Sequence, residues 1–513
     1  MLPEHQPESA AECRDRSQIP APDAGRASAH RHGTPVPRRL LYVSVFLSGA
    51  VVMTFELVGS RLLAPFLGSG LVVWTSLIGV VLGALSLGYW LGGVLADSRR
   101  DSDSLGLLLM GSGLMIALTS LLSEPIRAWG LPAGRVEVHS LLVSVVLFAP
   151  ASVLLGCISP YATRLGISGL KEAGRHIGTV YAVSTAGSIL GTFAAGFFLI
   201  PWLGSTRLLY LVAGVQVLLA LPFCARRWMP LLALALVLAA LTWQDSRSPE
   251  PGLLLDIDTP YSRVRVVRSH DGQGRPLNLL VDSPGGAQAA SYLDSDELVF
   301  DCLRAFRLVN HILPKPRRAL LIGGGGFAWP KDFLGWNPWS QMDVVEIDPT
   351  MEEVARQFFR HRPDPRVRVF HEDGRVFLNR RPGPYDVVFL DAFGTSDAIP
   401  FQLTTVEALH RVSEALVPRG VVLANLLGAP EGQGAAFIRR QVASYRQVFP
   451  RVFLFQVDPG LDKTSLQNLT LLALKDARTP FPQAAANIQP LRVRPDRPLT
   501  DDHAPVEWLA RHR

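Results

Sequence analysis

The sequence is short of cysteine and of charge for its length of 513 residues. Its four cysteines, Cys13, Cys157, Cys224 and Cys302, show no CxxC spacing and lie mostly among apolar residues. We therefore expect reduced thiols and neither a disulfide framework nor a zinc site. Only 18% of the residues are charged, 48% are hydrophobic, and the mean hydropathy is +0.22. This balance is unusual for a soluble chain, and the length predicts two or three domains.

The basic excess, a formal net charge of +6, does not by itself indicate nucleic acid. Much of the excess lies in loops between apolar segments, where membrane topology accounts for it. We therefore expect a lipid bilayer as partner and no nucleic acid. The apolar residues fill the first half of the chain, and charge concentrates after about Ser246, which marks a domain boundary.

The composition of residues 1–37 predicts a disordered tail, and this stretch lacks the features of a secretory signal. Residues 38–244 predict a helical transmembrane domain of about seven segments, most of them near the roughly 20 residues that span a bilayer. The segments are Leu40–Leu63, Leu71–Ala96, Leu105–Leu122, Val138–Ala162, Ile177–Pro201 and two short ones, Leu208–Phe223 and Trp228–Trp243. Frequent glycines predict close helix packing, as at Gly79, Gly83, Gly88, Gly92 and Gly93.

The loop charges raise a conflict about orientation. With the N-terminus inside, the basic residues on the inside are Arg26, Arg31, Arg38, Arg39, Arg99, Arg100, Arg164, Lys171, Arg175, Arg226 and Arg227, and those on the outside are Arg61, Arg127, Arg135, Arg207 and Arg247. This excess favours an inside N-terminus. Seven crossings would then put the C-terminal half outside, unless the short seventh segment does not cross or one span is misplaced.

Two charged residues fall in or near the first apolar segment, Glu56 and Arg61. Charges inside a membrane are costly and often mark pathways or binding sites. The alternative is a structural pair near the interface, with Arg61 reaching toward the polar headgroups. Both readings stay open.

Residues 245–285 predict a linker followed by a small β unit. Asp245–Leu255 is polar, and Tyr261–Val267 and Leu277–Val281 are typical of two strands joined across the turn residues Asp271, Gly272 and Gly274. Asp294–Asn310 then predicts an amphipathic helix leading into the next strand.

A nucleoside-binding pattern begins at Ala319. The apolar run Ala319–Ile322 predicts a buried strand, and it leads into four glycines, Gly323–Gly326. A second strand, Met342–Val345, ends on Glu346, and 346 − 326 gives the 20 residues expected between such a turn and an acid that binds ribose hydroxyls. Because the glycines are consecutive rather than spaced as GxGxxG, the pattern favours an adenosine-type ligand over a dinucleotide.

The following strands predict a doubly wound α/β domain over residues 286–513. Val367–Phe370, Tyr385–Leu390 and Gly420–Asn425 read as buried strands that alternate with helices such as Thr350–Phe359 and Thr404–Leu416. Glu346, Asp373 and Asp391 stand at successive strand ends, where ligands bind in such sheets. Asp373 alone would be explained as a helix cap.

With these residues in place, the C-terminal half resembles the spermidine synthases, the polyamine aminopropyltransferases. The resemblance covers about Asp256–Gly434, through Thr259–Tyr261, Ile322–Gly325, Val345–Asp348, Glu372–Arg375 and Tyr385–Val388. The whole chain looks more like the membrane-fused branch of that family, on the strength of Phe55–Leu57 with Arg61, Gly191–Gly204 and Thr500–Glu507.

The resemblance implies the following assignments. Decarboxylated S-adenosylmethionine would be a co-substrate, with no prosthetic group and no metal, and Asp391 would be the base that takes a proton from the attacking amine. The donor-binding residues would be Gly323, Gly324, Gly325, Glu346, Asp373, Gly374 and Pro400. The amine-binding residues would be Tyr261, Gln288 and Asp397. The catalytic domain is then expected to be cytoplasmic in a multi-pass protein of the cell (inner) membrane, against the loop charges.

The amine half of the pattern departs from the family. Gly326 stands where an Asp usually grips the amine, Ser262 replaces a Gln, and Phe300-Asp301-Cys302 replaces Tyr-His-Glu. The loop after Asp391 is also altered. The lost carboxylates would have to come from Asp301, Asp397, Asp501 or Asp502, the last two anchored by the apolar stretch Val506–Leu509.

Three functions therefore stay open. The first is a membrane-bound aminopropyltransferase that acts on a small amine such as putrescine and releases methylthioadenosine. The second is a methyltransferase that uses S-adenosylmethionine itself, since the loss of Asp at Gly326 weakens the argument for the decarboxylated donor. The third is a non-catalytic nucleoside sensor that regulates a membrane transporter, motivated by Glu56. A homo-oligomer is compatible with all three.

Overall fold

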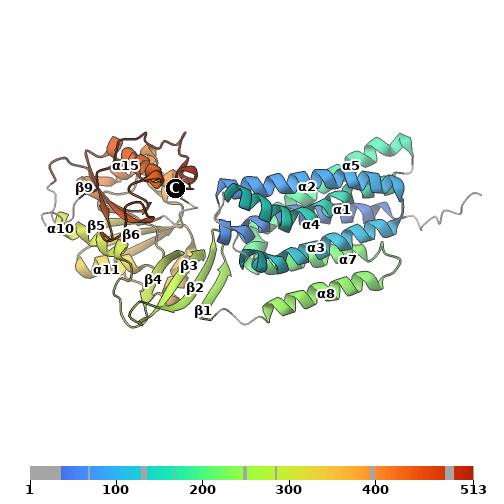
Figure 1. Ribbon diagram of the computed structural model, residues 1–513, viewed down its shortest axis with the longest axis horizontal. Helices are drawn as coiled ribbons and strands as arrows, with labels where there is room; N and C mark the ends of the chain where they lie inside the picture. The colour runs from blue at the N-terminus through green and yellow to red at the C-terminus, as the bar shows by residue number, and fades with distance from the viewer. Residues whose placement is uncertain are drawn as a thin grey trace, which may run out of the picture.

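The computed structural model describes residues 36–67, 70–128, 136–167, 169–246, 251–283, 286–392, 399–479 and 490–511. Nearly all of the predicted N-terminal tail lies outside these ranges. The described chain forms a bundle of long helices and, at one end of this bundle, an α/β unit built on two sheets (Figure 1). The fold class predicted from the sequence is confirmed.

The helical half consists mainly of long apolar helices. They are α1 (Arg38–Leu67), α2 (Leu71–Ser98), α3 (Ser102–Ala128), α4 (Val136–Gly166), α5 (Leu170–Ala194) with its π-helical continuation Ala195–Leu199 and α6 (Ile200–Leu203), α7 (Ser205–Ala220) and α8 (Trp228–Asp245). Five spans, the last running from α5 through α6, are long and apolar enough to cross a membrane, whereas α7 and α8 are shorter. The two short segments predicted from the sequence are thus the two short helices.

Close packing between α2 and α4 depends on glycine. A Cβ atom on Gly88 would lie 2.3 Å from the carbonyl oxygen of Val153, and one on Gly92 would lie 2.6 Å from the Cα atom of Cys157. Gly79, Gly83 and Gly93 have no neighbouring atom within 4 Å at the same point. The sequence therefore predicted the packing role correctly for two of these five glycines, because glycine count alone does not say which helix face meets a neighbour.

The two ends of the bundle differ in charge. One end joins Arg38 to Glu172, Arg164 to Asp97 and the backbone N–H of Ala225 to Asp103. It gathers the basic residues Arg38, Arg39, Arg99, Arg100, Arg164, Lys171, Arg175, Arg226 and Arg227. The other end faces the α/β unit (Figure 1). Helix α1 begins at the first end, and α8 leads into the α/β unit at the second. The chain therefore runs along the length of the bundle an odd number of times.

The first sheet of the C-terminal half is an antiparallel meander. Its strands are β1 (Leu253–Asp258), β2 (Arg263–His270), β3 (Pro276–Ser283) and β4 (Gly286–Tyr292), paired in chain order. The sequence predicted only the central pair. Strands β1 and β4 were missed because β1 was read as linker and the small residues of β4 carry a weak apolar signal.

The second sheet has seven strands in the order β10-β11-β9-β8-β5-β6-β7. They are β5 (Arg318–Ile322), β6 (Gln341–Glu346), β7 (Val367–His371), β8 (Tyr385–Leu390), β9 (Leu416–Gly428), β10 (Arg451–Gln456) and β11 (Gln467–Leu474). The five strands from β9 to β7 are parallel, and β11 runs antiparallel to both of its neighbours. The parallel core matches the prediction, and the antiparallel edge is an addition to it.

Helices cover this sheet and join its strands. They are α9 (Asp301–Ala305), α10 (Val309–Ile312), α11 (Ala328–Trp336), α12 (Pro349–Phe358), α13 (Gly374–Asn379), α14 (Val406–Ala415), α15 (Ala436–Val448) and α16 (Val506–Arg511). The helix predicted over Asp294–Asn310 is wrong in its first part, because residues 294–300 are irregular and the helix starts at Asp301. Short side chains that favour turns, such as Ser295, Asp294 and Asp296, explain that start.

Candidate active site

The glycine turn and Asp391 meet where the strand order of the second sheet reverses. Strand β5 pairs with β6 on one side and with β8 on the other, so the connections from β5 and β8 leave in opposite directions. The backbone N–H of Asp391 donates to the carbonyl oxygen of Ile322 at 2.9 Å. Gly323 has a φ of 98°, and a Cβ atom there would lie 2.3 Å from the carbonyl oxygen of Asp391. Only glycine fits at this position.

Glu346 holds the turn in place. Its Oε2 accepts hydrogen bonds from the N–H groups of Gly324 at 2.8 Å and Gly325 at 3.2 Å, and its Oε1 accepts one from the N–H of Asp348 at 3.1 Å. A carboxylate offers about four lone-pair positions. The arrangement leaves capacity for a ligand hydroxyl, and it adds a structural role that the sequence did not reveal.

Asp373 caps the helix that follows it. Its Oδ1 accepts from the N–H groups of Arg375 at 2.8 Å and Val376 at 3.0 Å, and its Oδ2 accepts from Gln402 Nε2 at 3.3 Å. The capping role considered from the sequence is therefore present. Gly374 is buried against β5, where a Cβ atom would lie 2.6 Å from Ile322 Cγ2. Pro400 precedes the short helical turn Phe401–Leu403 beside these residues.

The carboxyl group of Asp391 is a candidate general base. Burial raises the pKa of Asp391 to about 6, and a hydrogen bond that Asn425 Nδ2 donates to Asp391 Oδ1 at 3.0 Å acts in the opposite direction. Asn425 Oδ1 is buried with no hydrogen-bond partner among the described residues. From the sequence, Asn425 was predicted only as the last residue of a strand. Its polar side chain in an otherwise apolar strand was the one feature that could have pointed to a role in the site.

The space beside Gly326 is apolar and narrow. A Cβ atom there would lie 2.9 Å from Ala289 Cβ and 3.2 Å from Phe359 Cδ1. Ala289 belongs to β4, so the meander passes directly beside the glycine turn. An aspartate at position 326 would not fit without displacing these side chains.

The acids considered as replacements do not gather at this point. Asp301 is exposed and pairs with Arg304 at 2.8 Å. Asp501 binds Arg375 at 2.7 Å and Thr405 Oγ1 at 2.6 Å, so the C-terminal segment does return to the sheet but at the helix capped by Asp373. Asp502 is exposed. Asp397 lies outside the described residues.

Two further predicted amine-binding residues lie on the meander. Tyr261 is 51% exposed in a tight turn in which Thr259 Oγ1 accepts from the N–H groups of Tyr261 at 3.2 Å and Ser262 at 3.0 Å. Gln288 is an exposed residue of β4, next to the buried Ala289. Their roles toward an amine stay predictions.

Cys302 is a buried thiol close to Asp391. The thiol is buried, and burial, together with the negative charge of Asp391, raises the pKa of Cys302 to about 12. A thiol that remains protonated is a poor nucleophile.

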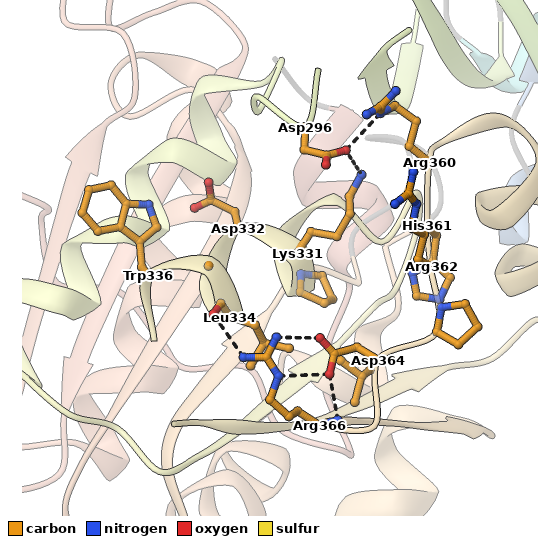
Figure 2. A pocket seen from close by; sticks show the side chains of 14 residues that line it. Asp296, Lys331, Asp332, Leu334, Trp336, Arg360, His361, Arg362, Asp364 and Arg366 are labelled. Carbon is orange, nitrogen blue, oxygen red and sulfur yellow. Dashed lines mark hydrogen bonds and ion pairs between the residues drawn. The ribbon is translucent and has the colours of Figure 1, made fainter. Parts of the chain in front are cut away.

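A separate cavity of about 660 Å³ lies along α11 and the connection from α12 to β7 (Figure 2). Its charged side chains largely pair with one another. Lys331 and Arg360 share Asp296 at 3.3 and 3.0 Å, and Arg366 binds Asp364 at 2.6 Å. None of the strand-end residues described above lines it, so we do not assign the nucleoside to this cavity.

The order of the second sheet, the glycine turn after β5 and the acid after β6 together define a Rossmann-like, nucleoside-binding transferase fold. The spermine/spermidine synthase domain family matches residues 306–457. A polyamine aminopropyltransferase from Vibrio vulnificus is 32% identical over 185 residues, which cover 35% of this chain and 60% of that protein, less than two thirds of its length.

Two other relatives extend over most of the chain. Polyamine aminopropyltransferase 1 from Streptomyces coelicolor is 25% identical and matches 80% of this chain and 79% of its own length. Its namesake from Ralstonia nicotianae is 24% identical over 79% of each. A match over 80% of the chain necessarily includes part of the helical half. A solved structure of a probable spermidine synthase from Corynebacterium glutamicum aligns at 21% identity over 45% of this chain and 81% of its own, with a TM-score of 0.37, which adds nothing to the assignment.

The spermine/spermidine synthase domain thus matches residues 306–457 of the α/β unit, relatives named polyamine aminopropyltransferase match most of the chain, and the apolar helices fit a membrane domain fused to this unit.

Proposed function

We propose that the protein is a membrane-bound polyamine aminopropyltransferase that moves an aminopropyl group from decarboxylated S-adenosylmethionine to a small amine such as putrescine. One observation carries the proposal: a carboxylate with a raised pKa, Asp391, lies against the glycine turn at the switch point of the sheet. The match of residues 306–457 to the spermine/spermidine synthase domain and the similarity to polyamine aminopropyltransferases support the reaction class and the donor.

The proposal assigns each part of the donor to a residue near the glycine turn. Gly323–Gly325 leave their backbone accessible to the methionine-derived part, Glu346 has remaining capacity for ribose hydroxyls, and Asp373 and Gly374 flank the place of the adenine, with Pro400 beside them. Asp391 then lies beside the sulfonium end. These roles agree with one another because the glycine turn contacts both Glu346 and Asp391.

The reaction needs a neutral amine in line with a reactive carbon. The nitrogen lone pair attacks the aminopropyl carbon next to sulfur, the carbon–sulfur bond breaks, and its electron pair neutralises the sulfonium to give methylthioadenosine. The proton lost by the amine goes to the Asp391 carboxylate. An aspartate with a pKa of about 6 is a stronger base than one at the ordinary value of about 3.9, which favours that transfer.

A comparison of donors tests the proposal. Purified full-length protein is incubated with putrescine and either decarboxylated S-adenosylmethionine or S-adenosylmethionine, and the nucleoside products are separated by chromatography. The proposal predicts methylthioadenosine from the first donor and little S-adenosylhomocysteine from the second. S-adenosylhomocysteine from the second donor and no methylthioadenosine from the first would make the protein a methyltransferase. This alternative is included because position 326 carries Gly in place of the acid.

Binding without turnover is the third outcome. Protein that binds methylthioadenosine but releases no product with a panel of amines would have to be regarded as a nucleoside sensor. We also propose that the helical half anchors the protein in the cell membrane, with the α/β unit on the side where the donor is made.

A further inference from the structure

The ends of two bundle helices hold one loop of the C-terminal half. Arg61, near the end of α1, donates from Nη2 to the carbonyl oxygen of Pro260. The N–H of Ser205, the first residue of α7, donates to Asp258 Oδ2 at 2.7 Å, and a carboxylate is favoured at a helix start. The loop 258–260 is therefore fixed from the membrane side at both of these points.

An acid at the tip of β6 lies within electrostatic range of Arg61. Asp348 is 2% exposed, and its Oδ1 caps α12 by accepting from the N–H of Thr350 at 2.9 Å. Asp348 Oδ2 has no hydrogen-bond partner among the described residues. The charges of Asp258 and Asp348 both lie close enough to interact with the Arg61 guanidinium. A buried carboxylate oxygen without a hydrogen bond is costly, so a nearby positive charge offsets part of that cost.

Asp348 connects this charge to the glycine turn. Its N–H donates to Glu346 Oε1, and Glu346 Oε2 accepts from Gly324 and Gly325. Asp348 and Glu346, both at the end of β6, thus connect Arg61 of α1 to the glycine turn. A shift of Asp348 would carry Glu346, and the turn, with it.

We infer that Arg61 is a positioning residue of the donor site, through which the membrane bundle sets the affinity of the C-terminal half for its nucleoside. The identity of the ligand rests on the proposed function. The membrane domain then acts as part of the binding site as well as an anchor. Within the described part of the chain, Glu56 makes no hydrogen bond or ion pair with Arg61, so of the two readings left open by the sequence the structural pair is not supported, and Arg61 instead contacts Pro260.

The test measures nucleoside binding by the full-length protein in detergent. Arg61→Ala is expected to raise the Kd for methylthioadenosine and the KM for the donor about tenfold, with kcat at saturating donor within about twofold, and Arg61→Lys is expected to recover part of the loss. The matched control is Arg164→Ala, which removes an exposed helix-end arginine that pairs with Asp97 at 3.0 Å at the other end of the bundle. This control should leave the Kd unchanged.

A second variant isolates the charge. Asp348→Asn keeps a good helix cap but removes the carboxylate. If Arg61 acts through Asp348, Arg61→Ala should weaken binding much less in the Asp348→Asn protein than in the wild type. Should Arg61→Ala fold poorly, Arg61→Lys takes its place in the same comparison with Asp348→Asn.

The inference is overturned if Arg61→Ala and Arg164→Ala bind methylthioadenosine equally well, or if the effects of Arg61→Ala and Asp348→Asn simply add. Wild-type protein that binds methylthioadenosine and shows this pattern without transferring an aminopropyl group would refute the proposed chemistry and leave the positioning role standing. Wild-type protein that does not bind methylthioadenosine at all would refute both.

Discussion

Asn425 donates a hydrogen bond from Nδ2 to Asp391 Oδ1 at 3.0 Å, across the adjacent strand ends of β9 and β8. It is the hydrogen bond that opposes the effect of burial on the Asp391 carboxyl. The side-chain oxygen of Asn425, Oδ1, is buried and has no hydrogen-bond partner among the described residues. We regard Asn425 as the residue that orients the base.

The first prediction concerns pH. A base with a pKa of about 6 is protonated as the pH falls through 6, so kcat/KM should decline on the acid side of that value more steeply than amine titration alone requires. Asn425→Ala removes the hydrogen bond that lowers the pKa of Asp391, so the decline should begin at a higher pH. Asn468→Ala, at an exposed position of β11, is the control. Identical pH profiles for the three proteins would contradict the assignment.

The second prediction concerns Gly326. Gly326→Ala should destabilise the protein by about 1–3 kcal/mol, because its Cβ would lie 2.9 Å from Ala289 Cβ in a packed site. Gly335→Ala is the matched substitution, since no atom lies within 4 Å of that point in α11, and it should stabilise by about 0.5–1 kcal/mol. Thermal unfolding in the same detergent measures both. Effects of the same sign would show that the space beside Gly326 is not filled.

The parts of the site that the sequence predicted are those governed by local spacing. The local pattern is a buried strand followed by a run of glycines and, 20 residues further on, an acid. This pattern predicts which strand ends carry the glycine turn and the acids, and β5, β6 and β8 form where it predicts strands. The parallel pairing of these strands then brings Glu346 and Asp391 to one edge of the sheet.

The parts that were missed depend on contacts between segments far apart in the chain. Ala289 and Phe359 close the space beside Gly326, yet neither has a pattern that points to a site. Arg61 was recognised as an unusual charge in an apolar segment, but its partner, the carbonyl oxygen of Pro260, is a backbone atom and leaves no trace in the sequence. Likewise, β11 lies between β9 and β10 in the sheet. This position depends on pairing between segments that are distant in the sequence.

The third prediction concerns the acceptor. The acids considered as replacements do not lie beside the glycine turn where they are described, and the space beside Gly326 is apolar. A second ammonium group should therefore gain little, so that kcat/KM for putrescine should exceed that for 1-butylamine by less than about tenfold, or 1.4 kcal/mol. Methylthioadenosine release with the two amines measures the ratio. A preference above about a hundredfold would show that a further carboxylate binds the distal ammonium.

The fourth prediction concerns topology. The start of α1 and the α/β unit lie at opposite ends of the bundle, so reporters fused to the two termini should lie on opposite sides of the membrane (Figure 1). The basic residues at the N-terminal end favour a cytoplasmic N-terminus, whereas a cytosolic donor needs a cytoplasmic α/β unit. Reporters on the same side would show that one helix does not cross. An α/β unit outside would contradict the use of a cytosolic donor.

The most direct test of the account is the effect of Asp391→Asn on methylthioadenosine release from decarboxylated S-adenosylmethionine, with Asp301→Asn as the control at an exposed acid on α9. The account predicts a loss of roughly 10²–10⁴-fold for Asp391→Asn, the range typical of a missing general base, with methylthioadenosine binding retained and Asp301→Asn within about twofold of the wild type. An Asp391→Asn protein that releases methylthioadenosine at the wild-type rate would contradict the role of Asp391 and the proposed mechanism.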